Sequence, residues 1–331
     1  MRIFINGFGR IGRTVLRQVL TGASTDVEIV GINDIAPLET CAYLLKFDSV
    51  FGPFPQSVKA GEIEITIGHT RIPFTTLDDI SSLDLSGVDL VFECTGCANT
   101  KEVAMRGLEA GAKYVLISGP SSAADVTVVL GANEDQLGNA QIVSNASCTT
   151  NAIAPLLRVL DAEWGLAHAH ITTIHCYTGS QPTVDTPASS FMRSRAAAVS
   201  MVPTSTSAAQ QIKAVLPEFT DRLSIAAVRV PVISVSAIDV VLQLVEPLKQ
   251  PVLQALEQTF CGSNIVGLTH DACVSIDMRG RPQSLVLAMP ETQLISDQQV
   301  RLFGWYDNEW GFSARMLDMA KQIIACGKRD P

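Results

Sequence analysis

One cysteine stands where a strand-like run gives way to a helix-like run, and a thiol in that position can act as a nucleophile. Cys148 follows the apolar residues Ile142 and Val143, and it precedes apolar residues at the helical positions 153, 156, 157 and 160. The unpaired N–H groups and the positive dipole end at a helix start favour the thiolate, which is the reactive form. An isolated cysteine in a polar turn can equally be inert, so the hypothesis depends on the rest of the chain.

A histidine at the end of a later strand-like run is a candidate base for this thiol. His175 closes the run 168–175 in the second half of the chain. An imidazole within hydrogen-bonding distance can hold a thiolate as an ion pair and then act as a general base. The chain has five histidines, so His69, His168, His170 and His270 remain alternatives at this point.

A glycine-rich loop near the amino terminus has the pattern of a dinucleotide-binding turn. A strand-like run over residues 2–5 leads into Gly7, Gly9 and Gly12, with Arg10 and Ile11 inside the loop and a helix-like pattern after it. The first glycine permits a tight turn, the second lets the backbone approach a pyrophosphate, and the third lets the helix pack closely on the strand. The order strand, loop and helix predicts a nucleotide site.

A carboxylate at the end of the next strand-like run indicates which dinucleotide is bound. Asp34 follows the run 27–32 and lies about 20 residues beyond the last glycine, the spacing at which a carboxylate meets the adenosine ribose. Its charge would repel a 2′-phosphate, which predicts NAD rather than NADP as the cofactor. Thr95, Gly96 and Ser118 follow later strands of the same half, and we expect them to line the cofactor crevice.

The order of the predicted elements divides the chain into two domains. Residues 1–147 read as a doubly wound, Rossmann-type NAD-binding domain, with a β-hairpin over 62–67 and 70–74. Residues 148–312 read as a catalytic domain, because the alternating runs 226–230 and 234–245 are typical of a mainly antiparallel sheet with one covered face. An amphipathic helix at about 313–331 is expected to pack back on the first domain. The predicted fold class is α/β followed by α+β.

Composition excludes several classes of protein. Of the 331 residues 47% are hydrophobic and 17% are charged, which describes two packed cores rather than a disordered chain. The net charge of −9 argues against nucleic acid as a partner. No apolar run reaches the roughly 18 residues of a membrane span, and no secretory leader is visible, so we expect a cytoplasmic protein without a membrane partner.

The cysteines suggest neither a disulfide framework nor a metal centre. The chain has eight cysteines at irregular spacing. Cys94 and Cys97 have the spacing of a redox or zinc pair, but no second pair of this kind follows. We therefore predict no metal, and a redox role for the pair remains an alternative.

Taken together, these motifs resemble the phosphorylating glyceraldehyde-3-phosphate dehydrogenase family, type I and bacterial-like, over nearly the whole chain. The similar segments are residues 6–13, 147–151, 175–178, 195–197, 203–206, 229–231 and 305–311. The resemblance implies oxidation of D-glyceraldehyde 3-phosphate with NAD, followed by phosphorylation to 1,3-bisphosphoglycerate, through a hemithioacetal and a thioester on Cys148. It also implies a homotetramer, with the phosphorylated aldehyde and inorganic phosphate as the small-molecule partners.

The resemblance assigns roles position by position. Cys148 matches the nucleophile and His175 the base, while Asn308 matches the residue that orients the nicotinamide carboxamide. The residues expected to hold the substrate or the attacking phosphate are Ser147, Thr149, Thr178, Arg193, Arg195, Thr206, Ser207 and Arg229.

Two departures from the family pattern leave alternatives open. Ala152 stands where many members have a second cysteine, which excludes an intrahelical disulfide. Ser207 stands where glycine is usual beside the phosphate, and its Cβ would hinder a positive φ. The alternatives are an erythrose-4-phosphate dehydrogenase, a paralogue that uses another aldehyde or phosphate analogue, and a redox sensor that uses Cys148.

Overall fold

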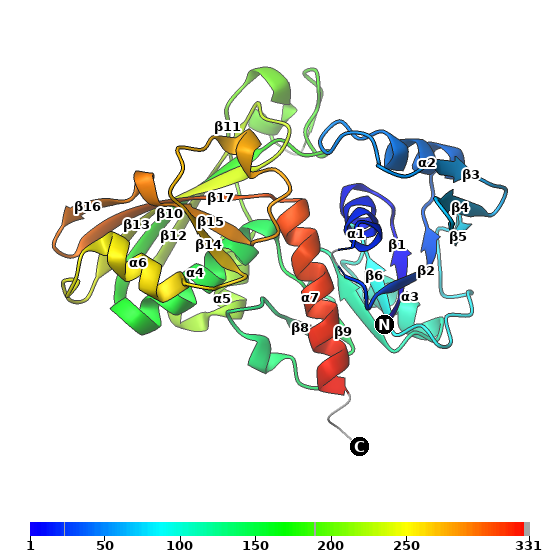
Figure 1. Cartoon of the computed structure of the whole chain (residues 1–331), viewed down its shortest axis with the longest axis horizontal. Helices are drawn as coiled ribbons and strands as arrows, with labels where there is room; N and C mark the ends of the chain where they lie inside the picture. Colours follow the sequence, from blue (N-terminus) through cyan, green and yellow to red (C-terminus); the bar gives the residue numbers. More distant parts are fainter. Residues whose placement is uncertain (23, 189, 328–331) are drawn as a thin grey trace. The chain divides into compact units, whose positions relative to one another are not determined.

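The computed structural model describes residues 1–22, 24–188 and 190–327, and the chain separates into two compact units (Figure 1). Unit 1 contains Met1–Val128, Asn133–Ala146 and the residues from Ser313 onward. Unit 2 contains Val129–Ala132 and Ser147–Phe312. The division thus falls one residue before the expected boundary, and it assigns a short segment before residue 133 to unit 2. Residues 328–331 of the expected terminal helix lie outside the described residues.

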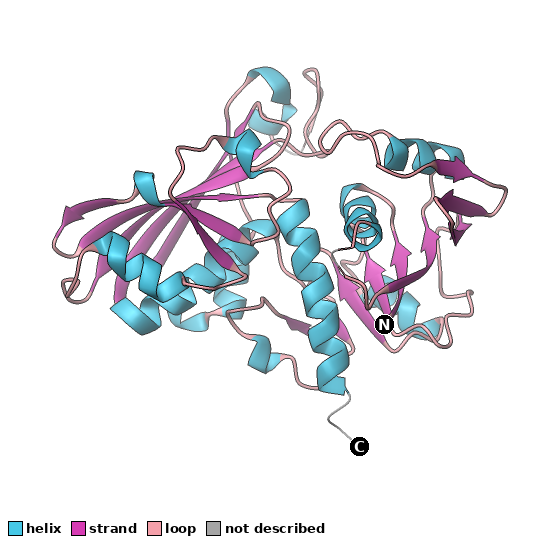
Figure 2. Cartoon of the chain, in the orientation of Figure 1, coloured by secondary structure: helices cyan, strands magenta, loops and turns pink. Residues whose placement is uncertain are grey.

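Unit 1 is built on a nine-stranded sheet whose central strands are parallel (Figure 2). Its strands, in order across the sheet, are β3 (Val58–Ala60), β4 (Glu64–Ile67), β5 (Thr70–Thr75), β2 (Glu28–Asn33), β1 (Arg2–Asn6), β6 (Leu90–Glu93), β7 (Tyr114–Ile117), β9 (Ile142–Ser144) and β8 (Val126–Thr127). Its helices are α1 (Arg10–Leu20), α2 (Leu38–Lys46), α3 (Lys101–Glu109) and most of α7 (Trp310–Gly327). The antiparallel pair β4–β5 confirms the predicted hairpin.

Burial on both faces of the sheet explains why the central strands of unit 1 are continuous apolar runs in the sequence. Every residue of β6 is buried, as expected for a strand covered on both faces of a parallel sheet. The strand order turns at β1, which pairs in parallel with β2 on one side and β6 on the other. The carboxyl ends of these three strands therefore meet at a topological switch point, where ligands of doubly wound sheets bind.

Unit 2 is built on an eight-stranded, mainly antiparallel sheet. Its strands, in order, are β11 (Val202–Thr204), β12 (Leu223–Val230), β10 (Leu166–Cys176), β13 (Ser236–Leu244), β17 (Gln299–Tyr306), β15 (Leu285–Ala288) and β14 (Val266–Thr269), and β16 (Gln293–Ser296) pairs with β17. Two pairs, β10–β12 and β14–β15, are parallel. Helices α4 (Cys148–Trp164), α5 (Ala208–Val215) and α6 (Val252–Phe260) accompany the sheet. The predicted fold class is confirmed for both units.

Register in unit 2 brings functional candidates together. The inward positions of β13, among them Ile238, Val240 and Leu242, are fully buried, which anchors the sheet on one face. Along the parallel pair β10–β12, His175 lies opposite Arg229. Side chains opposite each other in a pair project from the same face of a sheet. The register therefore makes an arginine the neighbour of the predicted base.

The sequence patterns missed several short elements. Helix α2 and strands β3, β8, β11 and β14 to β17 do not follow from the patterns described above. Most of these strands have only three or four residues, too few to show a clear period, whereas β17 has eight residues with alternating burial and could have been found from its sequence. Among the described residues, no helix combines the length and the apolar character that crossing a membrane requires.

Candidate functional site

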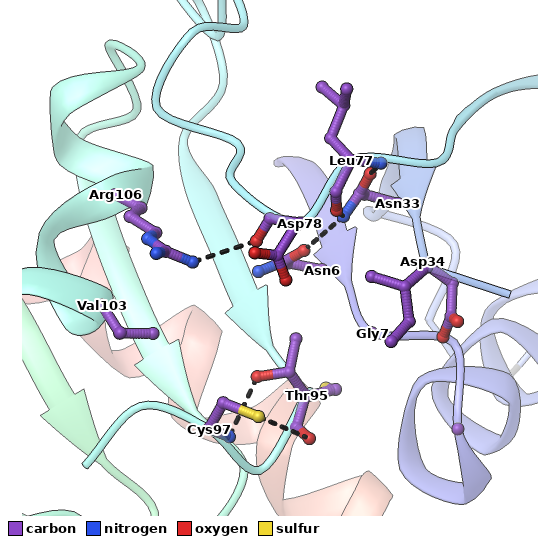
Figure 3. Close-up of a pocket in the computed structure, with 13 residues that line it drawn as sticks. Asn6, Gly7, Asn33, Asp34, Leu77, Asp78, Thr95, Cys97, Val103 and Arg106 are labelled. Atoms are coloured by element: carbon purple, nitrogen blue, oxygen red, sulfur yellow. Dashed lines mark hydrogen bonds between the residues drawn. The ribbon is translucent and has the colours of Figure 1, made fainter. Parts of the chain in front are cut away.

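A pocket of about 300 Å³ opens at the switch point of unit 1 (Figure 3). It is lined by the carboxyl ends of β1, β2 and β6, by the residues after β5 and by α3. The lining residues are Asn6, Gly7, Gly9, Asn33, Asp34, Ile35, Leu77, Asp78, Cys94, Thr95, Cys97, Val103 and Arg106. The predicted cofactor residues Gly7, Gly9, Asp34 and Thr95 are therefore brought together.

The three glycines of the loop serve different steric needs. Gly7 has φ +93°, and a Cβ there would lie 2.6 Å from the backbone of Cys94 and Thr95. A Cβ on Gly12 would lie 2.3 Å from the carbonyl oxygen of Gly7. A Cβ on Gly9 would meet no atom within 4 Å, so at this position the missing side chain leaves open space at the pocket. This arrangement fits a loop that closes around a pyrophosphate.

A chain of buried hydrogen bonds joins the strand ends under this pocket. Asn33 Nδ2 donates to Asn6 Oδ1 at 2.9 Å, and Asn6 Nδ2 donates to Glu93 at 2.6 Å. Glu93 also accepts hydrogen bonds from the backbone N–H and the hydroxyl of Thr95. Burial raises the pKa of Glu93, and these donors oppose the shift. The network holds Thr95 and the carboxyl end of β1 in place.

Asp34 is oriented by backbone donors. Its Oδ2 accepts from the N–H of Phe8 at 2.6 Å and its Oδ1 from the N–H of Ala36 at 2.8 Å. A carboxylate has about four acceptor sites, so each oxygen retains capacity for a ribose hydroxyl. A carboxylate that is oriented by two backbone N–H groups and lines the pocket fits the adenosine ribose of NAD.

The other predicted cofactor residues lie beside the pocket rather than among its lining residues. Arg10 forms an ion pair with Asp48 at 2.5 Å, and Gly12 and Ile11 belong to α1. Gly96, with φ +75°, forms the turn after Thr95, and the Ser118 N–H donates to the Glu93 carbonyl. Arg10 acts through its side chain, whereas the other four residues contribute backbone to the elements beside the pocket.

Sequence reasoning missed nine of the 13 residues that line this pocket. Arg106 of α3 donates to the carbonyl of Asp78 at 3.0 Å and pairs with Asp79 at 3.2 Å. Figure 3 shows Arg106 and Val103 facing the strand ends from the helix side of the pocket. Val103 and Arg106 are three positions apart on one face of α3. This spacing indicates a shared site only once α3 is known to lie beside β6.

A second pocket, of about 370 Å³, lies within unit 2 around the predicted nucleophile. It is lined from α4, β10, β12 and the segment 193–207. The lining residues are Ser147, Cys148, Thr149, Thr173, His175, Arg193, Thr204, Ser205, Thr206, Ser207, Ala227 and Arg229. Eight residues predicted from the sequence, including Cys148 and His175, thus lie around one cavity.

The thiol of Cys148 and the imidazole of His175 lie close together at the N-terminus of helix α4. Cys148 is its first residue, and Cys148 Sγ lies 3.5 Å from His175 Nε2. Of the five histidines considered from the sequence, His175 is the one that lines the pocket. Its ring packs edge-on against Tyr306, with 5.9 Å between the ring centroids. Proton transfer between sulfur and Nε2 therefore needs little movement.

Burial sets the charges of this pair. Desolvation raises the pKa of Cys148, and the positive charge of Arg229 opposes the shift. Desolvation lowers the pKa of His175 to about 4, and the same arginine lowers it further. The shifts favour a neutral thiol beside a neutral imidazole. They differ from the thiolate–imidazolium pair expected from the sequence, because that expectation included the helix dipole but not the loss of water.

The hydrogen bonds of the second ring nitrogen determine which tautomer can act as a base. His175 Nδ1 lies 2.7 Å from the carbonyl oxygen of Cys176, while Arg229 Nη1 lies 2.9 Å from that oxygen and 2.5 Å from Nδ1. When Nδ1–H donates to the carbonyl, Nε2 presents its lone pair to the thiol. This is the tautomer in which His175 can act as a base, whereas in the other tautomer Arg229 Nη1 would donate to Nδ1 and Nε2–H would face the thiol.

Ser147 and Thr149 hold the turn on either side of the thiol. Ser147 caps α4, with its Oγ accepting from the N–H of Thr150 at 3.2 Å. The Thr149 hydroxyl lies 3.0 Å from the hydroxyl of Tyr306, which also contacts Thr173 at 2.8 Å. Tyr306 thereby joins α4 to β10 under the pocket, a contact that its place in sequence did not reveal.

The cations of the pocket have neutral hydrogen-bond partners. Arg193 donates to Thr204 Oγ1 at 2.7 Å and to the Ser205 carbonyl at 3.0 Å. The hydrogen bond of Arg229 to the Cys176 carbonyl oxygen likewise leaves its charge uncompensated. Together with the nearby hydroxyls, these guanidinium groups form a site suited to a phosphate. Ser207 has φ −75°, so the predicted conflict with its Cβ does not arise.

Three predicted residues lie away from the lining of this pocket. Arg195 pairs with Asp185 at 2.8 Å on the surface, and the Thr178 hydroxyl lies 3.0 Å from that of Ser180. Asn308 is buried, and its Oδ1 accepts from Cys176 Sγ and from Ser236 Oγ, each at 3.2 Å. Among the residues that the structure describes, no cluster of three or more His, Cys, Asp or Glu side chains could hold a metal ion.

Comparisons with known proteins cover both units. One family model, described as the NAD binding domain of glyceraldehyde 3-phosphate dehydrogenase, matches residues 1–101, and the model of the C-terminal domain of the same enzyme matches residues 147–308. The glyceraldehyde-3-phosphate dehydrogenases of Cereibacter sphaeroides and Xanthobacter flavus are 45% and 44% identical, each over 99% of both chains. That of Pseudomonas aeruginosa is 41% identical over 98% of both chains. The chain therefore belongs to the glyceraldehyde-3-phosphate dehydrogenase family, and it is an NAD-dependent dehydrogenase.

Proposed function

We propose that this enzyme oxidises D-glyceraldehyde 3-phosphate and transfers inorganic phosphate to the product, which forms 1,3-bisphosphoglycerate. The observation that carries the proposal is the 3.5 Å approach of Cys148 Sγ to His175 Nε2 in a pocket that contains two arginine guanidinium groups. A nucleophile beside a base suits an aldehyde, and the cations suit its phosphate group and a second phosphate. The names of the relatives support the same substrate.

The first step is addition of the Cys148 sulfur to the aldehyde carbon. His175 Nε2 accepts the thiol proton as the C–S bond forms, and the proton then passes to the former carbonyl oxygen. The N–H groups in the first turn of α4 are donors for the developing oxyanion. A neutral imidazole is required for this step, and the low pKa of His175 keeps it neutral at physiological pH.

The second step makes a thioester on Cys148. When bound, NAD supplies the hydride acceptor for this oxidation. His175 takes the hydroxyl proton as the carbon is oxidised, which restores the carbonyl group. Gly7, Gly9, Asp34 and Thr95 would hold the cofactor, and Asn308 would orient its carboxamide.

The third step replaces sulfur by phosphate. Arg193, Thr206 and Ser207 would hold inorganic phosphate, while Arg229 would bind the substrate phosphate or the acceptor. A phosphate oxygen attacks the thioester carbon, the C–S bond breaks, and Cys148 recovers a proton from His175. The free energy of oxidation is thereby retained in an acyl phosphate rather than lost by hydrolysis.

A steady-state assay of NADH formation tests the proposal. With D-glyceraldehyde 3-phosphate and NAD, we expect turnover that requires inorganic phosphate and yields the acyl phosphate in equal amount. Equal rates with and without phosphate would contradict the proposal and would favour a hydrolysing enzyme of the erythrose-4-phosphate dehydrogenase type. Absence of aldehyde oxidation, together with rapid reaction of Cys148 with peroxide, would favour redox sensing.

We further propose a homotetramer in the cytoplasm. Exposed apolar side chains support assembly, notably Phe191 at 97%, Val199 at 79% and Met201 at 74% exposure. All eight cysteines are free thiols, which suits a reducing compartment. Sedimentation should give four times the mass of the chain, and fractionation should recover the enzyme with soluble cytoplasmic markers. A particle with the mass of one chain would refute the tetramer.

A further inference from the structure

A buried glutamine connects the nucleophile turn with the phosphate-binding segment. Gln211 lies on α5 and is 8% exposed. Its Oε1 accepts from the N–H of Ser147 at 2.7 Å and from the hydroxyl of Thr150 at 2.8 Å. Its Nε2 donates to Ser207 Oγ at 2.9 Å. One amide group therefore touches both sides of the pocket.

The hydrogen-bond partners determine which way this amide faces. A backbone N–H can only donate, so the atom that meets Ser147 N must be the amide oxygen. The amide nitrogen is then the atom that faces Ser207. Because Ser207 Oγ accepts this N–H, the proton of the Ser207 hydroxyl points elsewhere. Ser207 is exposed and lines the cavity, so that proton is available to an oxyanion there.

The other end of the amide acts on the turn that presents the thiol. Ser147 precedes Cys148 and caps α4, and Thr150 is the residue whose N–H that cap holds. The residue before the cap, Ala146, has φ +54°, which is unfavourable for a side chain with a Cβ. A strained turn persists only where its surroundings hold it, and the bonds from Gln211 hold the residues directly after it.

From these contacts we propose that Gln211 is a positioning residue that couples phosphate binding at Ser207 to the orientation of Cys148. Its carbonyl end holds the nucleophile turn, and its N–H end directs the Ser207 hydroxyl into the pocket. This inference deepens the proposed function, since it assigns Ser207 and Gln211 to the phosphate-dependent step.

Two substitutions separate the two ends of the amide. Gln211→Glu keeps oxygen acceptors for Ser147 N–H and Thr150, but its carboxylate would draw the Ser207 proton away from the pocket. Gln211→Ala removes both ends. Gln210→Ala is the matched control, because Gln210 is the exposed neighbour on the same helix. The measurements are the KM for inorganic phosphate, kcat, and the rate of Cys148 alkylation by iodoacetamide, quantified on the Cys148 peptide with and without phosphate.

For Gln211→Glu we expect the phosphate KM to rise about tenfold or more, as for loss of a hydrogen bond to a charged group. The alkylation rate without phosphate should stay within about twofold of the original enzyme, with weaker protection by phosphate. Gln211→Ala should change both the phosphate KM and the alkylation rate, and Gln210→Ala should change neither. An unchanged phosphate KM in the glutamate variant would overturn the proposal, even if the alanine variant failed to fold.

The alkylation measurement distinguishes failure of this inference from failure of the proposed function. If the unmodified enzyme formed NADH without any need for phosphate, the proposed function would fail. Protection of Cys148 by phosphate, weakened in Gln211→Glu but not in Gln210→Ala, would still support the coupling. Equal protection in all variants would overturn it.

Discussion

The two pockets of this enzyme are made in different ways. The pocket of unit 1 follows the ends of neighbouring parallel strands and one short loop, and glycines and backbone groups form much of it. The pocket of unit 2 collects side chains from α4, β10, β12 and the segment 193–207, which are far apart in sequence. The first provides space and hydrogen bonds, while the second arranges a thiol, an imidazole and two guanidinium groups.

This difference indicates how each pocket should fail. A pocket defined by backbone proximity is sensitive to added volume where the chain is closely packed, because one methyl group on Gly7 or Gly12 would meet main-chain atoms. A pocket defined by side-chain chemistry is sensitive to the identity and charge of single groups. The following predictions use substitutions that separate these two kinds of sensitivity.

The largest effect is expected from Cys148→Ser. The hydroxyl is a far weaker nucleophile than the thiol, so NADH formation should fall by about 10⁴-fold. NAD binding, measured by titration of protein fluorescence, should change little, because Cys148 is not among the residues that line the pocket of unit 1. A parallel loss of NAD affinity would show that the two pockets are not chemically separable.

Next in size is the dependence of stability on the charge of His175. Its folded pKa of about 4 lies below the unfolded value of 6.5, so the unfolded state binds the proton more readily. The contribution is fully present above pH 6.5 and is lost as the pH falls towards 4, by about 3 kcal/mol in total. Urea unfolding of His175→Gln should show a flatter pH profile in this window.

The exposed histidine His170 on the same strand provides the control for that profile. His170→Gln should keep the steep loss of stability between pH 6.5 and 4. If both variants kept the original profile, desolvation of His175 would not be the cause of the acid sensitivity. Its assignment as a neutral base would then be wrong.

The glycine loop should respond to added volume according to position. In Gly12→Ala the new Cβ would lie 2.3 Å from the Gly7 oxygen, so we expect a loss of about 1–3 kcal/mol of stability together with NAD binding. This loss should exceed the helix-propensity gain of about 1 kcal/mol. Gly9→Ala meets no atom within 4 Å, so it should weaken NAD binding with little change in thermal stability. Equal stability of both variants would contradict the steric explanation.

The smallest effect is expected at the turn before the nucleophile. Ala146 is fully buried with φ +54°, and Ala154 is fully buried inside α4. Replacing Ala154 by glycine should cost about 2 kcal/mol, from helix propensity and a lost methyl contact. Ala146→Gly should cost less than about 1 kcal/mol, because relief of the left-handed strain offsets the lost contact. Equal costs in chemical denaturation would indicate that Ala146 is not strained.

The sequence was most informative where function is local in the chain. Gly7, Gly9 and Asp34 could be predicted because they belong to one contiguous βαβ motif. In this motif the glycines permit a tight turn and the approach of the backbone to the cofactor, and the aspartate follows the second strand. Arg106 and Gln211 could not be found, since helical residues reveal a function only when their neighbours are known. Arg193 and Arg195 show the limit most clearly: they are two positions apart, yet one lines the thiol pocket and the other pairs with Asp185.

The sequence by itself determined the fold class, the glycine loop, the residue types of the site and the family to which they belong. These features follow from local periodicity and from motifs that are contiguous in the chain. Only the tertiary structure showed that His175 Nε2 lies 3.5 Å from Cys148 Sγ, that burial disfavours a charge on both groups, and that Gln211 links the turn before Cys148 to Ser207. Desolvation and hydrogen-bond partners depend on atoms from several distant segments, so they exist only once the chain has folded.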